Sequence, residues 1–205
     1  TSVDAGFTPQ LEAAASWLAA HPWLVDGARW GAAGVGLFGV YCSVMVYVAT
    51  RREQWSALQT GVKFFGSTLL LGAAVVSCVS AWTLPEAALA RLPQGLYLAL
   101  LSASALKLAL ELPSLALVRD VGSSAGKRMA TVMLGQLRSL TMFRFGALFG
   151  CGMVLPTLLL ADVFPLAATP VLSLLIAVGL CAGELSERYM FFRAAPASRM
   201  PGSLS

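Results

Sequence analysis

The sequence predicts an all-α fold, a polytopic membrane helical bundle of about five transmembrane helices. Hydrophobic residues make up 58% of the 205 residues and charged residues only 12%, whereas soluble domains carry about 25% charged residues. Five apolar stretches are each long enough for a membrane-spanning helix, which takes about 20 residues, and none alternates like a strand. They cover residues 30–49, 64–84, 95–118, 142–163 and 166–187.

These spans divide the chain into three parts. We expect an extracytoplasmic or interfacial segment, a transmembrane helical domain and a cytoplasmic tail, at residues 1–29, 30–188 and 189–205. In the first part, apolar residues such as Leu11 and Leu18 recur at helical spacing, which favours a short helix lying at the interface. The same residues also fit a loop that ends at Pro22, so both alternatives stay open.

The first two spans begin beside residues that are typical of a membrane interface. Arg29 and Trp30 precede the first span, and a basic loop ending at Lys63 precedes the second. The first span is rich in glycine, and its Ala32 and Gly36 have the small-x-x-x-small spacing. This spacing lets neighbouring helices approach each other closely.

Charged residues interrupt the third span. Lys107 and Glu111 stand four residues apart, so they share one face of the helix. Lys107 is eleven residues from the end of the span, roughly 16 Å at the helical rise and therefore near the middle of the bilayer. Charges at this depth are costly and usually face a bundle interior or a wet cavity. The two residues predict a proton relay or the polar end of a quinone pocket; the alternative is a neutralising pair.

The last two spans add further charges. Arg144 begins the fourth span, where Gly146 and Gly150 again have the spacing of packed helices. Near the end of the fifth span, Glu184 and Arg188 stand four residues apart in the order that favours a helical ion pair. We expect a structural ion pair between these two residues. The alternative is a bond from the fifth span to Arg144, because an isolated arginine at this depth would be costly.

The basic residues are divided unequally between the two sides of the predicted membrane. Ten of them lie in the loops 50–63 and 119–141 and after residue 187, whereas only Arg29 and Arg91 lie on the opposite side. Cytoplasmic loops carry an excess of Lys and Arg, so the carboxy terminus is predicted to be cytoplasmic. The net charge of +4 is explained by these loops and does not indicate a nucleic-acid partner.

The residue types that bind metals or carry out catalysis do not form a recognisable pattern. The four cysteines lie in different spans and form no C-x-x-C pair, so no iron–sulfur or zinc site is predicted. His21 is the single histidine, which argues against a haem held by two histidines on facing helices. The sequence also contains no phosphate-binding loop and no nucleophile motif. We therefore predict neither a catalytic residue nor a metal in this chain.

Four segments resemble the membrane-anchor subunit of dimethyl sulfoxide reductase and related molybdopterin oxidoreductases. The first two are Tyr41-Cys-Ser-Val-Met-Val-Tyr47, at the end of the first span, and Lys63-Phe64-Phe-Gly-Ser-Thr-Leu-Leu-Leu-Gly72, at the start of the second. The third is Arg144, and the fourth is Gly183-Glu184-Leu with Arg188 and the aromatic run that follows. The resemblance covers most of residues 30–202 and rests on the order and spacing of these segments.

The resemblance implies a helical subunit that anchors a molybdopterin catalytic subunit and an iron–sulfur electron-transfer subunit in the bacterial inner membrane. Such anchors exchange electrons between membrane quinone or quinol and the iron–sulfur clusters, and they carry no haem. We therefore expect quinone as the ligand, with the clusters and the molybdopterin held in partner subunits. Family members have more spans than this chain, so we expect further helices to precede Thr1.

Within this family, Lys107, Glu111 and Glu184 would be the candidates for proton handling. Arg144 would either have a structural role or provide a polar environment for a quinone headgroup. Two other functions also fit the residues. A small transporter or channel would use Lys107 and Glu111 as a substrate or proton site, and a purely structural anchor would hold its partners without contacting quinone.

Overall fold

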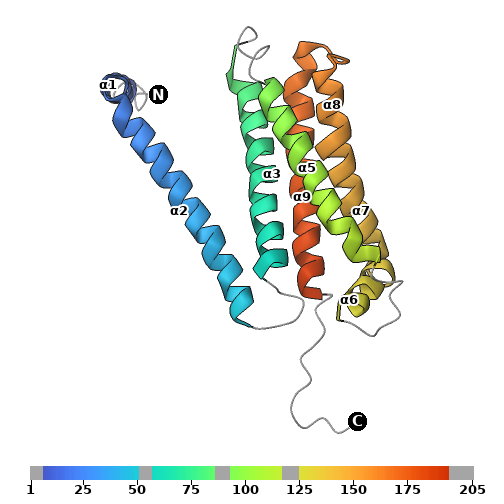
Figure 1. Ribbon diagram of the computed structural model, residues 1–205. Helices are drawn as coiled ribbons and strands as arrows, with labels where there is room; N and C mark the ends of the chain where they lie inside the picture. The colour runs from blue at the N-terminus through green and yellow to red at the C-terminus, as the bar shows by residue number, and fades with distance from the viewer. Residues whose placement is uncertain (1–6, 51–56, 86–92, 117–124, 194–205) are drawn as a thin grey trace. The chain divides into compact units, whose positions relative to one another are not determined.

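The computed structural model describes residues 7–50, 57–85, 93–116 and 125–193, and every regular element within these ranges is helical. The predicted all-α fold class is therefore confirmed for this part of the chain. The elements are α1 (Phe7–Ala20), α2 (Pro22–Ala49), α3 (Ala57–Thr83), α5 (Pro93–Ala116), α6 (Ala125–Leu134), α7 (Arg138–Phe149), the π-helical turn η2 (Gly150–Val154), α8 (Leu155–Leu160), the short 3₁₀ helix η3 (Leu166–Ala168) and α9 (Thr169–Arg193) (Figure 1).

Five helical segments of the described residues are long and apolar enough to cross a membrane, as predicted, so the chain is a multi-pass membrane protein. They are Pro22–Ala49, Ala57–Thr83, Gln94–Pro113, Arg138–Leu160 and Leu166–Arg193. The expected boundaries after residues 29 and 188 fall inside α2 and α9, which extend further. Polar residues near the end of a span need not end its helix. Asp26 and Arg29, for example, form an exposed ion pair (3.1 Å) one turn apart on α2.

The chain forms two compact units. The first, Thr1–Val46, contains α1 and most of α2, and the second, Tyr47–Ser205, contains the bundle of α3, α5, α7, α8 and α9. In the first unit, α2 begins at Pro22. Proline is favoured at the first position of a helix because the N–H that it lacks would have no partner there.

The core of the second unit lies between α3, α5, α7 and α9 (Figure 1). Its fully buried centre includes Leu70 on α3, Leu100 on α5, and Ile176 and Leu180 on α9. Lipid tails are as apolar as leucine, so apolar burial by itself does not drive these helices together. Their association depends instead on close packing and on polar contacts between helices.

A close contact between helices in the bundle depends on a glycine, Gly152, that the sequence pattern did not indicate. A Cβ atom on Gly152 would overlap the side chain of Ser104 on α5, so α5 and η2 approach closely at this point. A Cβ atom on Gly146 or Gly150 would meet nothing within 4 Å. The packing role predicted for Gly146 and Gly150 is therefore not found among the described residues. Spacing shows that small residues share a helix face, but it does not show what that face meets.

A π-helical turn joins α7 and α8 into one span. The Leu155 N–H bonds to the carbonyl of Gly150, five residues earlier rather than four. Pro156 follows this turn and is fully buried. In a regular helix its ring would clash with the carbonyl four residues earlier, that of Gly152. The wider turn accommodates the proline, and turns of this kind occur frequently at functional sites.

Thr141 holds the corner between α6 and α7 against α9. Its hydroxyl lies within hydrogen-bond reach of the carbonyls of Met133 (2.8 Å) and Leu137 (3.0 Å), and 3.3 Å from the sulfur of Met190. Residues three apart on a helix share a face. The contact therefore turns the side chain of Arg144, three residues further along α7, towards the interior of the bundle.

Candidate functional site

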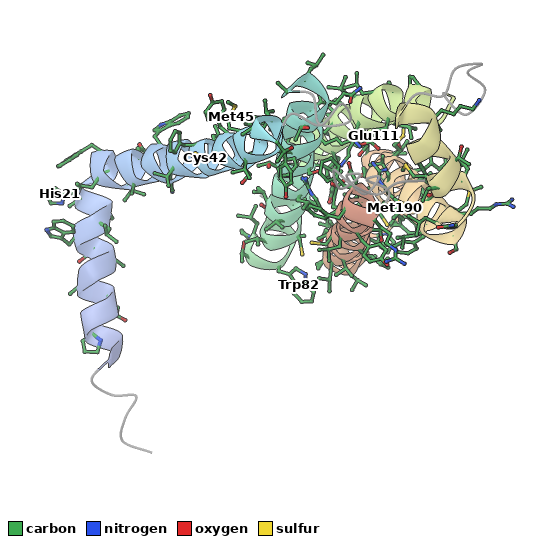
Figure 2. The ribbon with its side chains drawn as sticks, turned by 90° about the horizontal axis from the view of Figure 1, so that it is seen from below. His21, Cys42, Met45, Trp82, Glu111 and Met190 are labelled. Atoms are coloured by element: carbon green, nitrogen blue, oxygen red, sulfur yellow. The ribbon has the colours of Figure 1, made fainter. Side chains whose placement is uncertain are left out.

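Five charged side chains meet inside the bundle, and we call this group the ionic cluster. Lys107 and Glu111 lie on α5, Arg144 on α7, and Glu184 and Glu187 on α9, and each residue is at most 7% exposed. Figure 2 shows Glu111 among the helices of the second unit. Charges enclosed in a membrane-spanning bundle are rare and costly, so they persist only where they are paired or functional.

Lys107 connects three helices. Its ammonium group forms ion pairs with Glu184 and with Glu187 (2.7 Å), and it donates a hydrogen bond to Ser67 on α3 (3.1 Å). The Ser67 hydroxyl can donate to the carboxylate of Glu184 or to the backbone carbonyl of Lys63 (2.6 Å), one turn earlier. Because a hydroxyl has one hydrogen, these two acceptors share it. Ser67 thus ties α3 to the ion pair between α5 and α9.

Arg144 forms the other half of the ionic cluster. Its guanidinium group pairs with Glu111 on α5 and with Glu187 on α9 (3.1 Å). Glu187 therefore lies between Lys107 and Arg144 and joins the two halves. The second oxygen of Glu187, Oε1, is buried and has no hydrogen-bond partner among the described residues. This oxygen can therefore still accept a hydrogen bond from a group outside the cluster.

The ionic cluster lies towards one end of the bundle. Arg144 is six residues from the start of α7, and Glu187 is six residues from the end of α9, which is about 9 Å along the helix axis. Lys107 is nine residues from the end of α5, about 14 Å. Half of the hydrocarbon core is about 15 Å thick. Lys107 and Glu184 are thus each nine residues from a helix end, near the mid-bilayer depth that the sequence suggested for Lys107, whereas Glu187 and Arg144 lie closer to the helix ends.

The charges of the cluster are not balanced by direct ion pairs alone. Three carboxylates contact two cations, so the fully ionised cluster carries one excess negative charge. Lys63, partly buried on α3, also interacts electrostatically with Glu187. The cluster can therefore reach neutrality through Lys63, or through one proton on a carboxyl group.

Aromatic rings pack where α3 begins and α9 ends. The ring centroids of Phe64 and Phe191 are 6.5 Å apart, and Tyr47 lies 5.4 Å from the first and 5.5 Å from the second. The ammonium of Lys63 lies 5.6 Å from the centre of the Phe191 ring, and the guanidinium carbon of Arg188 lies 3.6 Å from the centre of the Phe64 ring. Each helix thus places a cation over a ring of the other helix, a favourable arrangement.

The structure brings all four predicted candidates, Lys107, Glu111, Arg144 and Glu184, into the ionic cluster. It also forms the bond from the fifth span to Arg144 that we considered as an alternative, although Glu187 makes it.

The predicted pair between Glu184 and Arg188 is not among the ion pairs of the described residues. Glu184 bonds to Lys107 and Ser67, whereas Arg188 stacks on Phe64. An ion pair within one helix contributes only about 0.3–0.5 kcal/mol. An enclosed carboxylate without a partner would cost far more, so the contact with Lys107 takes precedence.

Sequence reasoning misses two residues of the site, Glu187 and Ser67. A signal for Glu187 does exist, because it stands three residues from Glu184 and shares its helix face. Ser67 gives no such signal. Serines in helices often bond only to their own backbone, as Ser77 does ten residues further along α3 (2.7 Å to the Ala73 carbonyl).

Metal-binding residues do not gather in the described ranges: no group of three or more His, Cys, Asp or Glu side chains is placed to hold an ion. The four cysteines are free.

Fold and site together define a multi-pass helical membrane protein with a buried ionic cluster. In comparisons with known proteins, the chain matches no family model, no curated protein and no solved structure.

Proposed function

We propose that this chain is the membrane anchor and quinone-reactive subunit of a molybdopterin oxidoreductase complex in a bacterial inner membrane, with its carboxy terminus in the cytoplasm. It would pass electrons between membrane quinone and an iron–sulfur partner subunit, with molybdopterin in a third subunit. The observation that carries the proposal is the ionic cluster, where acids and bases from three helices meet near one end of the bundle. Ionisable groups inside a membrane mark ion or proton pathways by default.

The segments that resemble reductase anchors support the proposal because they meet in space. Tyr47, from the first segment, packs on Phe64, from the second. Ser67, also from the second, reaches Glu184, from the fourth. The third segment, Arg144, belongs to the same ionic cluster. A shared site requires such a gathering of residues that are far apart in the sequence.

The chemistry of the cluster fits a quinone site. Oxidation of a quinol releases protons together with electrons, so the site needs acid–base groups nearby. The cluster has one carboxylate more than it has directly paired cations, so it can take up a proton without gaining net positive charge. Glu187 can offer a position for this proton, because its Oε1 has no hydrogen-bond partner in the described part of the chain.

The same geometry favours a second candidate, a purely structural anchor. Lys107 and Arg144 each contact two carboxylates. Such contacts would be sufficient to lock α5, α7 and α9 together. In that case the charges would hold the helices in place and would not exchange protons with a ligand.

The full chain, purified with its partners from its native membranes, tests the proposal. Iron and molybdenum should co-purify with it, and the complex should turn over a soluble quinone analogue. Glu187→Gln removes one carboxylate but leaves the pairs Lys107–Glu184 and Arg144–Glu111 in place. We expect quinone-linked turnover to fall by about 10²-fold, the usual contribution of an acid–base group, while the metal content stays the same.

Arg138→Gln is the matched control, because Arg138 is exposed at the start of α7 and lies outside the cluster. This variant also loses one charge, and its turnover should be normal. If Glu187→Gln assembles fully and keeps normal turnover, the structural anchor is the better description. Co-purifying partners that contain neither iron nor molybdenum would contradict the proposal as a whole.

A further inference from the structure

The chain turns sharply between α1 and the spanning helix α2, and specific contacts hold this corner. One residue, His21, joins the two helices. Its N–H donates to the carbonyl of Leu18, and the N–H of Leu24 donates to the carbonyl of His21, both at 3.1 Å. The His21 ring stacks on Trp17 with 4.6 Å between centroids, and its Nδ1 donates to the Trp17 carbonyl (2.9 Å). Figure 2 shows α1 running across the direction of α2, with His21 at the corner.

The length of α2 places this corner at the surface of the bilayer. The helix has 28 residues, which span about 42 Å. The hydrocarbon core is about 30 Å thick, and the bilayer with its headgroups is about 40–45 Å thick. α2 can therefore cross both headgroup regions, which leaves its first residue, Pro22, at the surface. Because α1 turns away from the direction of α2 there, it runs along the bilayer.

Exposed tryptophans mark the same region as a membrane interface. Trp17 on α1 is 55% exposed, and Trp23 and Trp30 on α2 are 68% and 79% exposed. Tryptophan is enriched at headgroup level, because its ring is apolar and its N–H is polar. The exposed ion pair of Asp26 and Arg29 lies between the two tryptophans of α2. Both features are expected of a helix segment that crosses the headgroups.

The composition of α1 indicates which lipids it can bind. Glu12 is the only charged residue among the 14 of this helix. Helices that are drawn to a membrane by charge carry Lys and Arg on their polar face, and α1 has neither. Its attraction to lipid must come from apolar side chains such as Trp17 and Leu18, which are exposed.

We propose that α1 is an interfacial helix that lies on the lipid bilayer, and that it binds zwitterionic and anionic lipid equally well. Trp17 would lie among the headgroups, and Trp30 would lie deeper. The helix would then fix the depth of α2 in the membrane. This proposal is independent of the quinone function, because none of its residues belongs to the ionic cluster.

Depth-dependent fluorescence quenching of the full chain in vesicles tests this proposal. One variant keeps only Trp17 and another keeps only Trp30, with the other tryptophans replaced by phenylalanine. The vesicles are phosphatidylcholine with or without phosphatidylglycerol, and they carry lipids labelled with a nitroxide near the headgroup or deep in the tail. We expect the shallow label to quench Trp17 most and the deeper label to quench Trp30 most. Aqueous iodide should quench Trp17 weakly, and neither phosphatidylglycerol nor salt should change the result.

Three results would overturn the proposal. Strong iodide quenching of Trp17 without lipid quenching would place α1 in water. Protection from every quencher would place it against protein, such as a second copy of the chain. Dependence on anionic lipid would contradict binding through apolar residues. If the single-tryptophan variants do not fold, a nitroxide at Ala19→Cys, in a chain whose native cysteines are replaced by alanine, gives the same depth with all tryptophans present.

Discussion

At the scale of single residues, Glu187 differs from the other members of the ionic cluster. It is the carboxylate that contacts both Lys107 and Arg144. Removing one partner of a buried ion pair costs about 3–5 kcal/mol, because the other charge is left uncompensated. Loss of the Glu187 charge leaves each cation with one carboxylate, Glu184 or Glu111. The Glu187 charge can therefore be removed without leaving either cation unpaired, although two ion pairs are lost with it.

Ser67 and Ser77 allow a matched measurement of one polar contact. Both are buried on α3 and reach the carbonyl four residues earlier, but only Ser67 also contacts Lys107 and Glu184. A hydrogen bond to a charged group contributes about 1.5–3 kcal/mol, and an ordinary one within a membrane averages about 0.6 kcal/mol. Ser67→Ala should therefore lower the free energy of unfolding in mixed micelles by about 1.5–3 kcal/mol.

Ser77→Ala is the control, since it removes the same hydroxyl group without touching a charge. It should lower the free energy of unfolding by less than about 1 kcal/mol. Equal losses in the two variants would mean that the contacts of Ser67 with Lys107 and Glu184 contribute nothing to stability.

At the scale of elements, the span made of α7, η2 and α8 depends on a glycine for its contact with α5. Ser104, the neighbour of Gly152, is fully buried, so it has little room to move. Gly152→Ala should therefore lower the free energy of unfolding by about 1–3 kcal/mol, the usual cost of overpacking. Gly146→Ala should be neutral or stabilising by about 0.5–1 kcal/mol, because its Cβ would meet open space.

A second substitution separates overpacking from a backbone effect at the π-helical turn. Ser104→Gly removes the atoms that the new Cβ would meet, so it should restore part of the stability lost in Gly152→Ala. The free energies of unfolding of the two single variants and the double variant measure this coupling. If the two losses simply add, contact with Ser104 is not the cause.

At the scale of the whole molecule, the distribution of basic residues predicts the orientation in the membrane. Because cytoplasmic loops carry an excess of Lys and Arg, we predict that the carboxy terminus lies in the cytoplasm and the turn between α8 and η3 lies outside. In a chain without its native cysteines, Val163→Cys should react with an impermeant maleimide on intact cells. Ser205→Cys should react only after the cells are opened. Val163 is suitable because it is 58% exposed.

The opposite labelling pattern would reverse the predicted orientation of every span. It would leave the structure of the bundle unchanged, because no contact within it depends on which face meets the cytoplasm. It would, however, move the ionic cluster to the outer leaflet, and the side on which partner subunits dock would have to be reconsidered.

Much of the architecture follows from local properties of the chain. The apolar stretches are long enough to reveal the spans, and the charges inside them stand out against that background. Lys107, Glu111, Arg144 and Glu184 can therefore be found as candidates without a structure. The corner at His21 and the role of Ser67 cannot be found in this way, because both depend on the particular groups that these side chains contact, which residue type and spacing do not indicate.

The sequence by itself determined that this protein is helical, that it crosses the membrane several times, and which buried charges need partners. The cost of moving polar groups into lipid is a property of single residues and short segments, so it can be read from the sequence. Only the tertiary structure decided which charges meet. Glu184 pairs with Lys107 rather than with Arg188, and Glu187 joins both cations. These choices depend on which faces of distant helices come together, and spacing within one helix does not determine that.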